Sequence, residues 1–306
     1  MTDSNNTALS LPPSSVLSSE EVDGVMKGIA ALWKTGDIVP FLGPAIDRDP
    51  PPFPSGEHAL AAALGERVSV PGRLRGRVHE VAQYIESHKH RKTLEKLMEE
   101  LFRPVASPAP FHDLLAAFPV PLVVDFWYSR SASERLLRPG DFQIRAVSRT
   151  GSRDRWFTND RKTDDGWEAA DAPPPSARVL YRPLGSMLPK TDVIVSDADF
   201  VEILTEIDIQ SPIPPWVQRH RTGRHFLFAG LSFDNQTVRT FAKQIIKRSS
   251  TWHFAVLDRQ PTAKEERFFF REGIRVLPLP LNTEFVPSLD RLLRAIVAPT
   301  EDERTK

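Results

Sequence analysis

The sequence contains no cysteine. A chain without thiols forms no disulfide and holds no metal through thiolates, which excludes disulfide-rich modules and cysteine-ligated zinc sites. The eight histidines are scattered, and only His88 and His90 lie close together. No further ligand is spaced to complete a metal site with this pair, so we interpret both as part of a solvated helix face.

The sequence also lacks an excess of charge of either sign. Lys plus Arg and Asp plus Glu number 40 each, which gives a formal net charge of zero. No overall field therefore attracts nucleic acid or an anionic membrane, and such a partner would need a local patch of cations. The basic clusters at 73–77, 88–92 and 219–224 could together form a nucleic-acid face, but the neutral net charge disfavours that interpretation.

Long apolar runs are missing as well. No stretch of the sequence approaches the roughly 20 apolar residues that cross a bilayer, and the first residues lack the basic and apolar halves of a signal peptide. We therefore expect a cytoplasmic protein without a membrane partner.

What the chain does contain is an alternation of short apolar runs with helical patterns. Strands are expected at 37–42, 121–124, 178–181, 226–229, 253–257 and 274–277. Helices between strands predict an α/β fold, a Rossmann-like parallel sheet with helices on both faces. We expect one domain over 19–298, polar disordered tails at 1–18 and 299–306, and a small inserted lobe at about 150–178.

Residues 36–47 combine a strand with a glycine turn, Gly43-Pro-Ala-Ile-Asp47. They resemble the strand and Gly-Ala-Gly-x-Ser loop of bacterial sirtuin-like domains, in which backbone N–H groups receive the dinucleotide phosphates. The resemblance places Gly43, Ala45 and Asp47 at the cofactor. Pro44 removes one amide donor and Ala45 adds a methyl, so weak cofactor binding is expected.

Two further segments resemble the family where it carries its catalytic residues. The string Val-Asp-Phe-Trp-Tyr-Ser resembles the family's strand followed by Thr-Thr-Asn-Tyr-Asp, and matching Tyr128 puts Trp127 at the catalytic asparagine. The string Tyr-Arg-Pro-Leu-Gly-Ser resembles Tyr-Lys-Leu-His-Gly-Ser, which puts Leu184 at the histidine general base. Neither an indole nor an isobutyl chain accepts a proton, so the resemblance implies a catalytically silent member.

A fourth segment, 226–239, resembles the family's apolar strand, glycine turn, serine and aspartate. It implies that Gly230 allows a tight exit from the strand and that Ser232 bonds a ribose or phosphate. Asp234 is expected to face the crevice while capping the following helix. The absence of cysteine also removes the four-cysteine zinc module of sirtuin deacylases, so no zinc and no deacylation are expected.

These segments lie within roughly residues 25–297 and predict a catalytically silent sirtuin-like protein. It would bind NAD or an ADP-ribose-like nucleotide weakly, or act as a scaffold in a bacterial defence or conflict assembly, with a protein partner or as a homo-oligomer. One alternative is a divergent NAD glycohydrolase in which Asp125, Asp234 or His112 activates water. A second is a structural adaptor without a ligand. Trp127 is open to interpretation as a plug of the active site or as an ordinary core aromatic.

Overall fold

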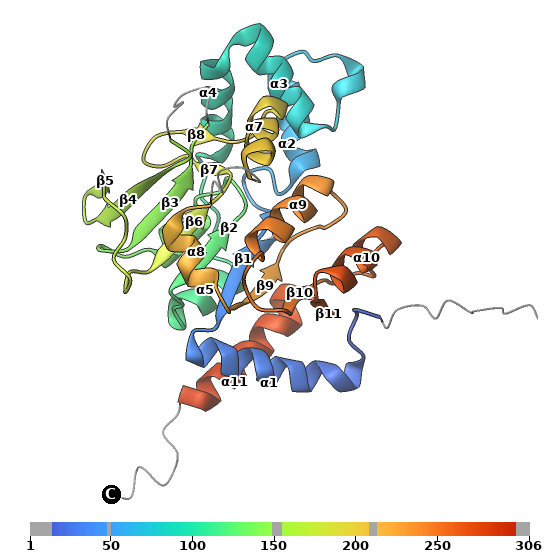
Figure 1. The fold of residues 1–306 in the computed structure, drawn as a ribbon. Coiled ribbons are helices and arrows are strands. Elements are labelled where there is room, and N and C mark those ends of the chain that lie inside the picture. The colour runs from blue at the N-terminus through green and yellow to red at the C-terminus, as the bar shows by residue number, and fades with distance from the viewer. Residues whose placement is uncertain (1–13, 48–49, 149–154, 208–212, 298–306) are drawn as a thin grey trace, which may run out of the picture.

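A large mixed sheet runs through the middle of the molecule (Figure 1). The computed structural model describes residues 14–47, 50–148, 155–207 and 213–297. Within these ranges nine strands pair in the order β11-β10-β9-β1-β2-β6-β3-β4-β5. They are β1 (Ile38–Leu42), β2 (Leu122–Asp125), β3 (Phe142–Ala146), β4 (Phe157–Thr163), β5 (Gly166–Ala169), β6 (Val179–Arg182), β9 (His225–Ala229), β10 (His253–Val256) and β11 (Ile274–Leu277). The short strands β7 (Gly185–Ser186) and β8 (Asp192–Val193) pair separately.

Neighbouring strands from β11 through β3 are parallel. Every residue of β1, β2, β6 and β9 is buried. Because such strands are covered on both faces, they appear in the sequence as short apolar runs rather than as alternating patterns. The predicted parallel α/β sheet is therefore confirmed.

An antiparallel hairpin of β4 and β5 extends one edge of the sheet next to β3. It occupies 157–169, within the segment where we expected an inserted lobe. Residues 149–154, the first part of that segment, lie outside the described ranges.

The helices account for most of the remaining described chain. They are α1 (Ser19–Thr35), α2 (Glu57–Arg67), α3 (Val78–Lys89), α4 (Arg91–Phe102), α5 (Pro110–Ala117), α6 (Ser131–Leu136), α7 (Asp197–Ile207), α8 (Pro215–Arg221), α9 (Gln236–Ile245), α10 (Ala263–Arg271) and α11 (Val286–Val297). Short turns of 3-10 helix lie at Pro44–Ile46 and Gly72–Leu74, and a π-helical turn at Leu281–Phe285 precedes α11.

Both faces of the sheet carry a hydrophobic core. Ile38 and Leu42 of β1 pack in a cluster with α1, α5 and α11, and Figure 1 shows α1 and α11 together on that face. Val39 and Phe41 point to the opposite cluster, which includes residues of α2, α3, α4, α9 and α10. Alternate residues of one strand thus serve opposite faces, as the pleat requires.

The described chain begins before α1. The backbone N–H of Leu17 donates to the carbonyl oxygen of Val276 in β11, and Val276 donates in turn to Ser15. Leu17 is buried, so residues 15–17 belong to the folded unit although we expected a tail up to residue 18. Residues 1–13 and 298–306 lie outside the described ranges.

The strand order reverses at β1. The chain runs from β1 to β2 on one side and returns later to β9 on the other. In open α/β sheets ligands bind at the carboxyl ends of the strands beside such a reversal. A ligand site is therefore expected at the loops that follow β1, β2 and β9.

Candidate functional site

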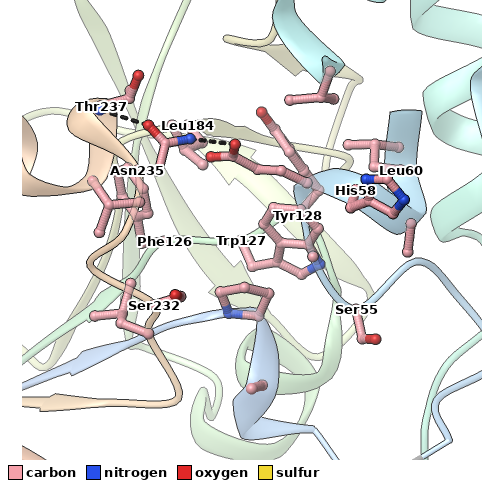
Figure 2. A pocket seen from close by; sticks show the side chains of 18 of the residues that line it. Ser55, His58, Leu60, Phe126, Trp127, Tyr128, Leu184, Ser232, Asn235 and Thr237 are labelled. Atoms are coloured by element: carbon pink, nitrogen blue, oxygen red, sulfur yellow. Dashed lines mark hydrogen bonds between the residues drawn. The ribbon is translucent and has the colours of Figure 1, made fainter. Parts of the chain in front are cut away.

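A cavity of about 670 Å³ opens where those loops meet (Figure 2). Its walls come from the turns after β1 and β9, the loop after β2, the beginning of α2 and α3, and the N-terminal half of α9. The sequence-predicted residues that line it are Ala45, Trp127, Leu184, Gly230, Ser232 and Asp234. The structure thus brings together six positions that the resemblance singled out.

Two glycines allow the turns after β1 and β9 to touch. A Cβ atom on Gly43 would lie 2.3 Å from the carbonyl oxygen of Gly230. Gly230 has a φ of +69°, and a Cβ there would lie 2.6 Å from the backbone nitrogen of Ile46. Both positions therefore require glycine for the approach of two backbones.

The amides of the turn after β1 are already engaged. Gly43 N–H donates to the carbonyl oxygen of Ala229 at 2.8 Å, and Ala45 N–H donates to Gly230 at 3.0 Å. Ile46 N–H donates within the turn to Gly43, and Pro44 has no N–H. Across the described residues 43–46, the turn is thus tied to β9 and leaves no amide to receive a phosphate.

Asp47 does not line the cavity but lies buried near it. Its Oδ2 accepts a hydrogen bond of 3.1 Å from Ser129 Oγ, and its Oδ1 lies 4.0 Å from His112 Nδ1. His112 is completely buried, and burial lowers its pKa because the charged imidazolium is desolvated. His112 is likewise absent from the cavity wall.

Asp125, at the end of β2, belongs to the same buried polar group. Its carboxylate lies 3.4 Å from the guanidinium of Arg182, which also donates to the carbonyl oxygens of Trp127 and Ser129. Burial raises the pKa of Asp125 to about 7, although the positive charge of Arg182 acts in the opposite direction. Arg182 thus holds the loop after β2 through two of its carbonyl oxygens. Asp125 is not part of the cavity wall.

Trp127 and Leu184 are both core residues and wall residues. Each is 3% exposed, and each lines the cavity. The indole N–H donates to the carbonyl oxygen of Pro54 at 2.9 Å, and the ring packs edge-on against Phe102. The two interpretations of Trp127 therefore do not exclude each other: its ring is fixed in the core and gives the cavity an apolar wall.

Ser232 and Asp234 form the polar rim after β9. Ser232 Oγ donates to Asp234 Oδ1 at 2.7 Å, and Arg259 donates to Ser232 Oγ at 3.2 Å. The residue that caps α9 is Asn235, whose Oδ1 accepts from the Thr237 N–H at 2.7 Å. Our expectation that Asp234 caps this helix was wrong, because Asn235 immediately precedes the first helical residue.

Sequence reasoning missed a polar pair on the opposite wall, Glu57 and His79. The Oε1 atom of Glu57 lies 3.9 Å from His79 Nε2, and its Oε2 accepts from the amide of Asn235, one of the two hydrogen bonds drawn in Figure 2. His79 Nδ1 lies 3.0 Å from the carbonyl oxygen of Val195, so Nδ1 carries the proton that it donates there. Burial raises the pKa of Glu57. The only signal in the sequence was a histidine and a glutamate on two separate helices, which is common on any protein surface.

The described part of the chain contains neither a metal-binding cluster nor a membrane-spanning helix. No cluster of three or more His, Asp or Glu residues is arranged there to hold a metal ion. None of the helices described there has the length and apolar character needed to cross a membrane.

Comparisons with known proteins give one family-model match and several similar solved structures. Residues 142–277 match the model of the SIR2-like domain. The solved structures include one reported for the mechanism and regulation of Sir2 enzymes, with 11% identity and a TM-score of 0.42, covering 90% of this chain and 99% of that one. A Sir2 homologue mutant in complex with ADP-ribose has 12% identity and a TM-score of 0.40, with coverages of 89% and 99%. Sequence identities and TM-scores this low add nothing to what the strand order already shows. No curated protein matches the chain.

Proposed function

We propose that this chain, which contains a SIR2-like domain, binds NAD or an ADP-ribose-like nucleotide weakly and does not cleave it. The observation that carries the proposal is the cavity at the strand reversal, in which Trp127 and Leu184 occupy the walls. These are the two positions where the resemblance places the catalytic asparagine and histidine.

The size and lining of the cavity suit a nucleoside. Ligand cavities in proteins typically measure roughly 300–1,000 Å³ and combine apolar walls with a few polar groups. Here Trp127 and Leu184 supply apolar surface, and Ser232, Asn235 and Glu57 supply groups that can bond ribose hydroxyls. A base and a ribose can therefore be held without any contact to the phosphates.

The same lining explains why we expect weak binding of the phosphates. The turn after β1 has no unengaged amide within residues 43–46, and the described residues that line the cavity include neither lysine nor arginine. Glu57 and Asp234 add carboxylates, which repel a pyrophosphate when ionised. Arg259 reaches Ser232 at the rim but is paired with Glu265 at 2.6 Å.

We expect no cleavage of the nucleotide because of the side chains at the positions where the resemblance places the family's catalytic residues. Neither Trp127 nor Leu184 can take a proton from water at neutral pH. Asp125 and His112, which we considered as substitutes, are 2% and 0% exposed and lie outside the cavity wall. A substrate in the cavity would not meet either group directly.

Calorimetric titration of the full chain with NAD and with ADP-ribose, together with an assay of nicotinamide release, tests the proposal. Ser232 is exposed at the rim, so Ser232→Trp fills the entrance without disturbing the core. Ser87→Trp, at an exposed position of α3 outside the cavity, is the matched control. We expect weak binding that Ser232→Trp abolishes and Ser87→Trp retains, with no nicotinamide released. A flat titration with both nucleotides would contradict the proposal.

The pairing of Glu57 with His79 in the cavity wall favours a second candidate, a divergent NAD glycohydrolase. In this case water forms a bond to the ribose carbon, the bond to nicotinamide breaks, and the proton of water passes to His79 Nε2 beside Glu57. Nicotinamide release that disappears in Glu57→Gln and in His79→Gln, but persists in His58→Gln, would establish it. His58 lines the same cavity and is the control histidine.

We also propose that the protein works in the cytoplasm with a protein partner or a second copy of itself, in a bacterial defence or conflict assembly. If both nucleotides fail to bind, the structural adaptor becomes the better explanation. Sedimentation of the purified chain, alone and after co-purification, distinguishes a self-assembling scaffold from a subunit of a mixed complex.

A further inference from the structure

A second cavity, distinct from the nucleotide site, lies between α9 and α10. It has a volume of about 520 Å³ and its described lining contains no carboxylate. The cations that line it are Arg239 and Lys243 of α9 and Lys264, Arg267 and Arg271 of α10. We call this feature the α9–α10 groove.

The groove continues toward the end of both helices. An adjoining cavity of about 500 Å³ shares Lys243, Gln244 and Arg271 with the first, and adds Phe270 and Glu272 to the wall. Glu272 is the acidic residue of this part and pairs with Arg271 at 2.8 Å. Because the two cavities share these wall residues, we treat them as one groove along α9 and α10, longer than a pocket for a single small ion.

Helical spacing explains why so many cations face one channel. Arg239 and Lys243 are four residues apart on α9, and Lys264, Arg267 and Arg271 follow at intervals of three and four on α10. Residues at these spacings share one face of a helix. Two such faces line the same cavity, so each wall presents a row of positive charge to the other.

The positive charge of two arginines in the groove is compensated by carbonyl groups rather than by carboxylates. The guanidinium of Arg239 donates to the carbonyl oxygens of Phe233 and Asp234. Arg267 donates to the carbonyl oxygen of Ala263 in its own helix at 3.1 Å. Cations predominate in this lining, in which Glu272 is the acidic residue, so the groove concentrates negatively charged ligands.

An exposed aromatic ring stands in the second half of the groove. Phe270 is 52% exposed and belongs to the groove wall. Trp252, 40% exposed, directly follows the wall residue Thr251, and its ring is held edge-on against Phe254. Rings of this kind are the platforms on which unpaired bases stack in proteins that bind single strands.

We propose that the α9–α10 groove binds single-stranded nucleic acid, with the cations along its walls contacting successive phosphates and Phe270 stacking on a base. A single phosphate would use only part of a channel with cations on both walls. The groove is separate from the nucleotide cavity, so this inference does not depend on the proposed function.

The zero net charge of the chain disfavours nucleic acid as a partner unless a local patch of cations is present. The α9–α10 groove is such a patch. It was not visible in the sequence, because its cations are interspersed with Glu265, Glu266 and apolar residues along α10.

Fluorescence anisotropy of a labelled oligo(dT) with the full chain tests the proposal. Binding should weaken with salt, because each neutralised phosphate adds about 0.7 to the slope of log K against log salt for single strands. Lys243→Gln and Arg267→Gln should each weaken binding and reduce that slope by about 0.7. Arg73→Gln, an exposed arginine in another basic cluster, should leave both unchanged.

The contact between Phe270 and a base should affect the affinity but not the salt dependence of binding. Phe270→Ala should weaken binding roughly 5- to 150-fold and leave the salt slope unchanged, since it removes stacking and no charge. Phe270 is exposed, so folding should survive, which a thermal melt verifies. Tighter binding to duplex than to oligo(dT), or equal affinities of wild type and Lys243→Gln/Arg267→Gln, would overturn the proposal. So would binding to vesicles of phosphatidylserine, or to inorganic phosphate alone, without binding to oligo(dT).

Discussion

At the residue scale, the junction of β1 and β9 depends on Gly230. We expect Gly230→Ala to lower the free energy of unfolding by about 3 kcal/mol or more, because a left-handed conformation in a residue other than glycine costs about 1–3 kcal/mol and the new methyl also meets backbone of Ala45 and Ile46. Chemical denaturation measures the loss. The nucleotide cavity should be disturbed as well, since this turn forms part of its wall.

Gly223→Ala is the matched control. Gly223 has a φ of +72°, and an added Cβ would meet no atom within 4 Å. It therefore shares the conformational cost without the clash, and we expect a loss of about 1 kcal/mol. Equal losses in the two variants would mean that the turns after β1 and β9 can separate without cost, contrary to the tight packing described above.

Individual residues show how far the sequence alone could predict the site. The resemblance brought Trp127, Leu184 and Ser232 to one cavity, because each follows a strand whose carboxyl end it marks. It placed Asp47 at the cofactor as well, and this prediction could not foresee that the side chain turns inward to Ser129. Glu57 was missed, since its partners come from other helices.

At the scale of elements, α9 links the stability of the fold to the nucleotide cavity. Asn235 caps α9 through its Oδ1, and its amide donates to Glu57 across the cavity. Asn235→Ala should lower stability by about 1 kcal/mol through the lost cap and also weaken nucleotide binding. Thr262→Ala, which removes the capping box of α10, should affect stability to a similar extent and leave the nucleotide affinity unchanged. Calorimetry and thermal melts measure both quantities, and loss of nucleotide affinity in both variants would show that the link is not local.

Elements also differ in how well the sequence predicts them. The parallel strands β1, β2, β6, β9, β10 and β11 were recognisable as short apolar runs, most of them with glycine or proline close by. The strand β3 was not expected, because Gln143 and Arg145 interrupt its apolar pattern. Both are buried in the structure: Gln143 donates to the carbonyl oxygen of Leu188 at 2.9 Å, and Arg145 pairs with Asp160 of β4 at 2.8 Å. Buried polar residues of this kind depend on partners that only the folded chain supplies.

At the scale of the whole molecule, stability should depend on pH through Asp125. An aspartate in an unfolded chain has a pKa near 3.8, and burial raises that of Asp125 to about 7. Between these values the folded state binds more protons than the unfolded state, so the free energy of unfolding falls as pH rises. This contribution is fully present below about pH 4 and is lost by about pH 7.

Asp125→Asn tests this expectation, because the amide is neutral at every pH and resembles a protonated carboxyl in shape. The variant should lack the decline that wild type shows between about pH 4 and pH 7, a difference on the order of a few kcal/mol, since one pKa unit corresponds to about 1.4 kcal/mol. Its absolute stability is not the readout, because the substitution also removes a counter-charge of buried Arg182. Urea denaturation at a series of pH values gives the two curves. If they run parallel throughout this window, Asp125 is ionised in the folded protein, and the attraction of Arg182 outweighs the desolvation of the carboxylate.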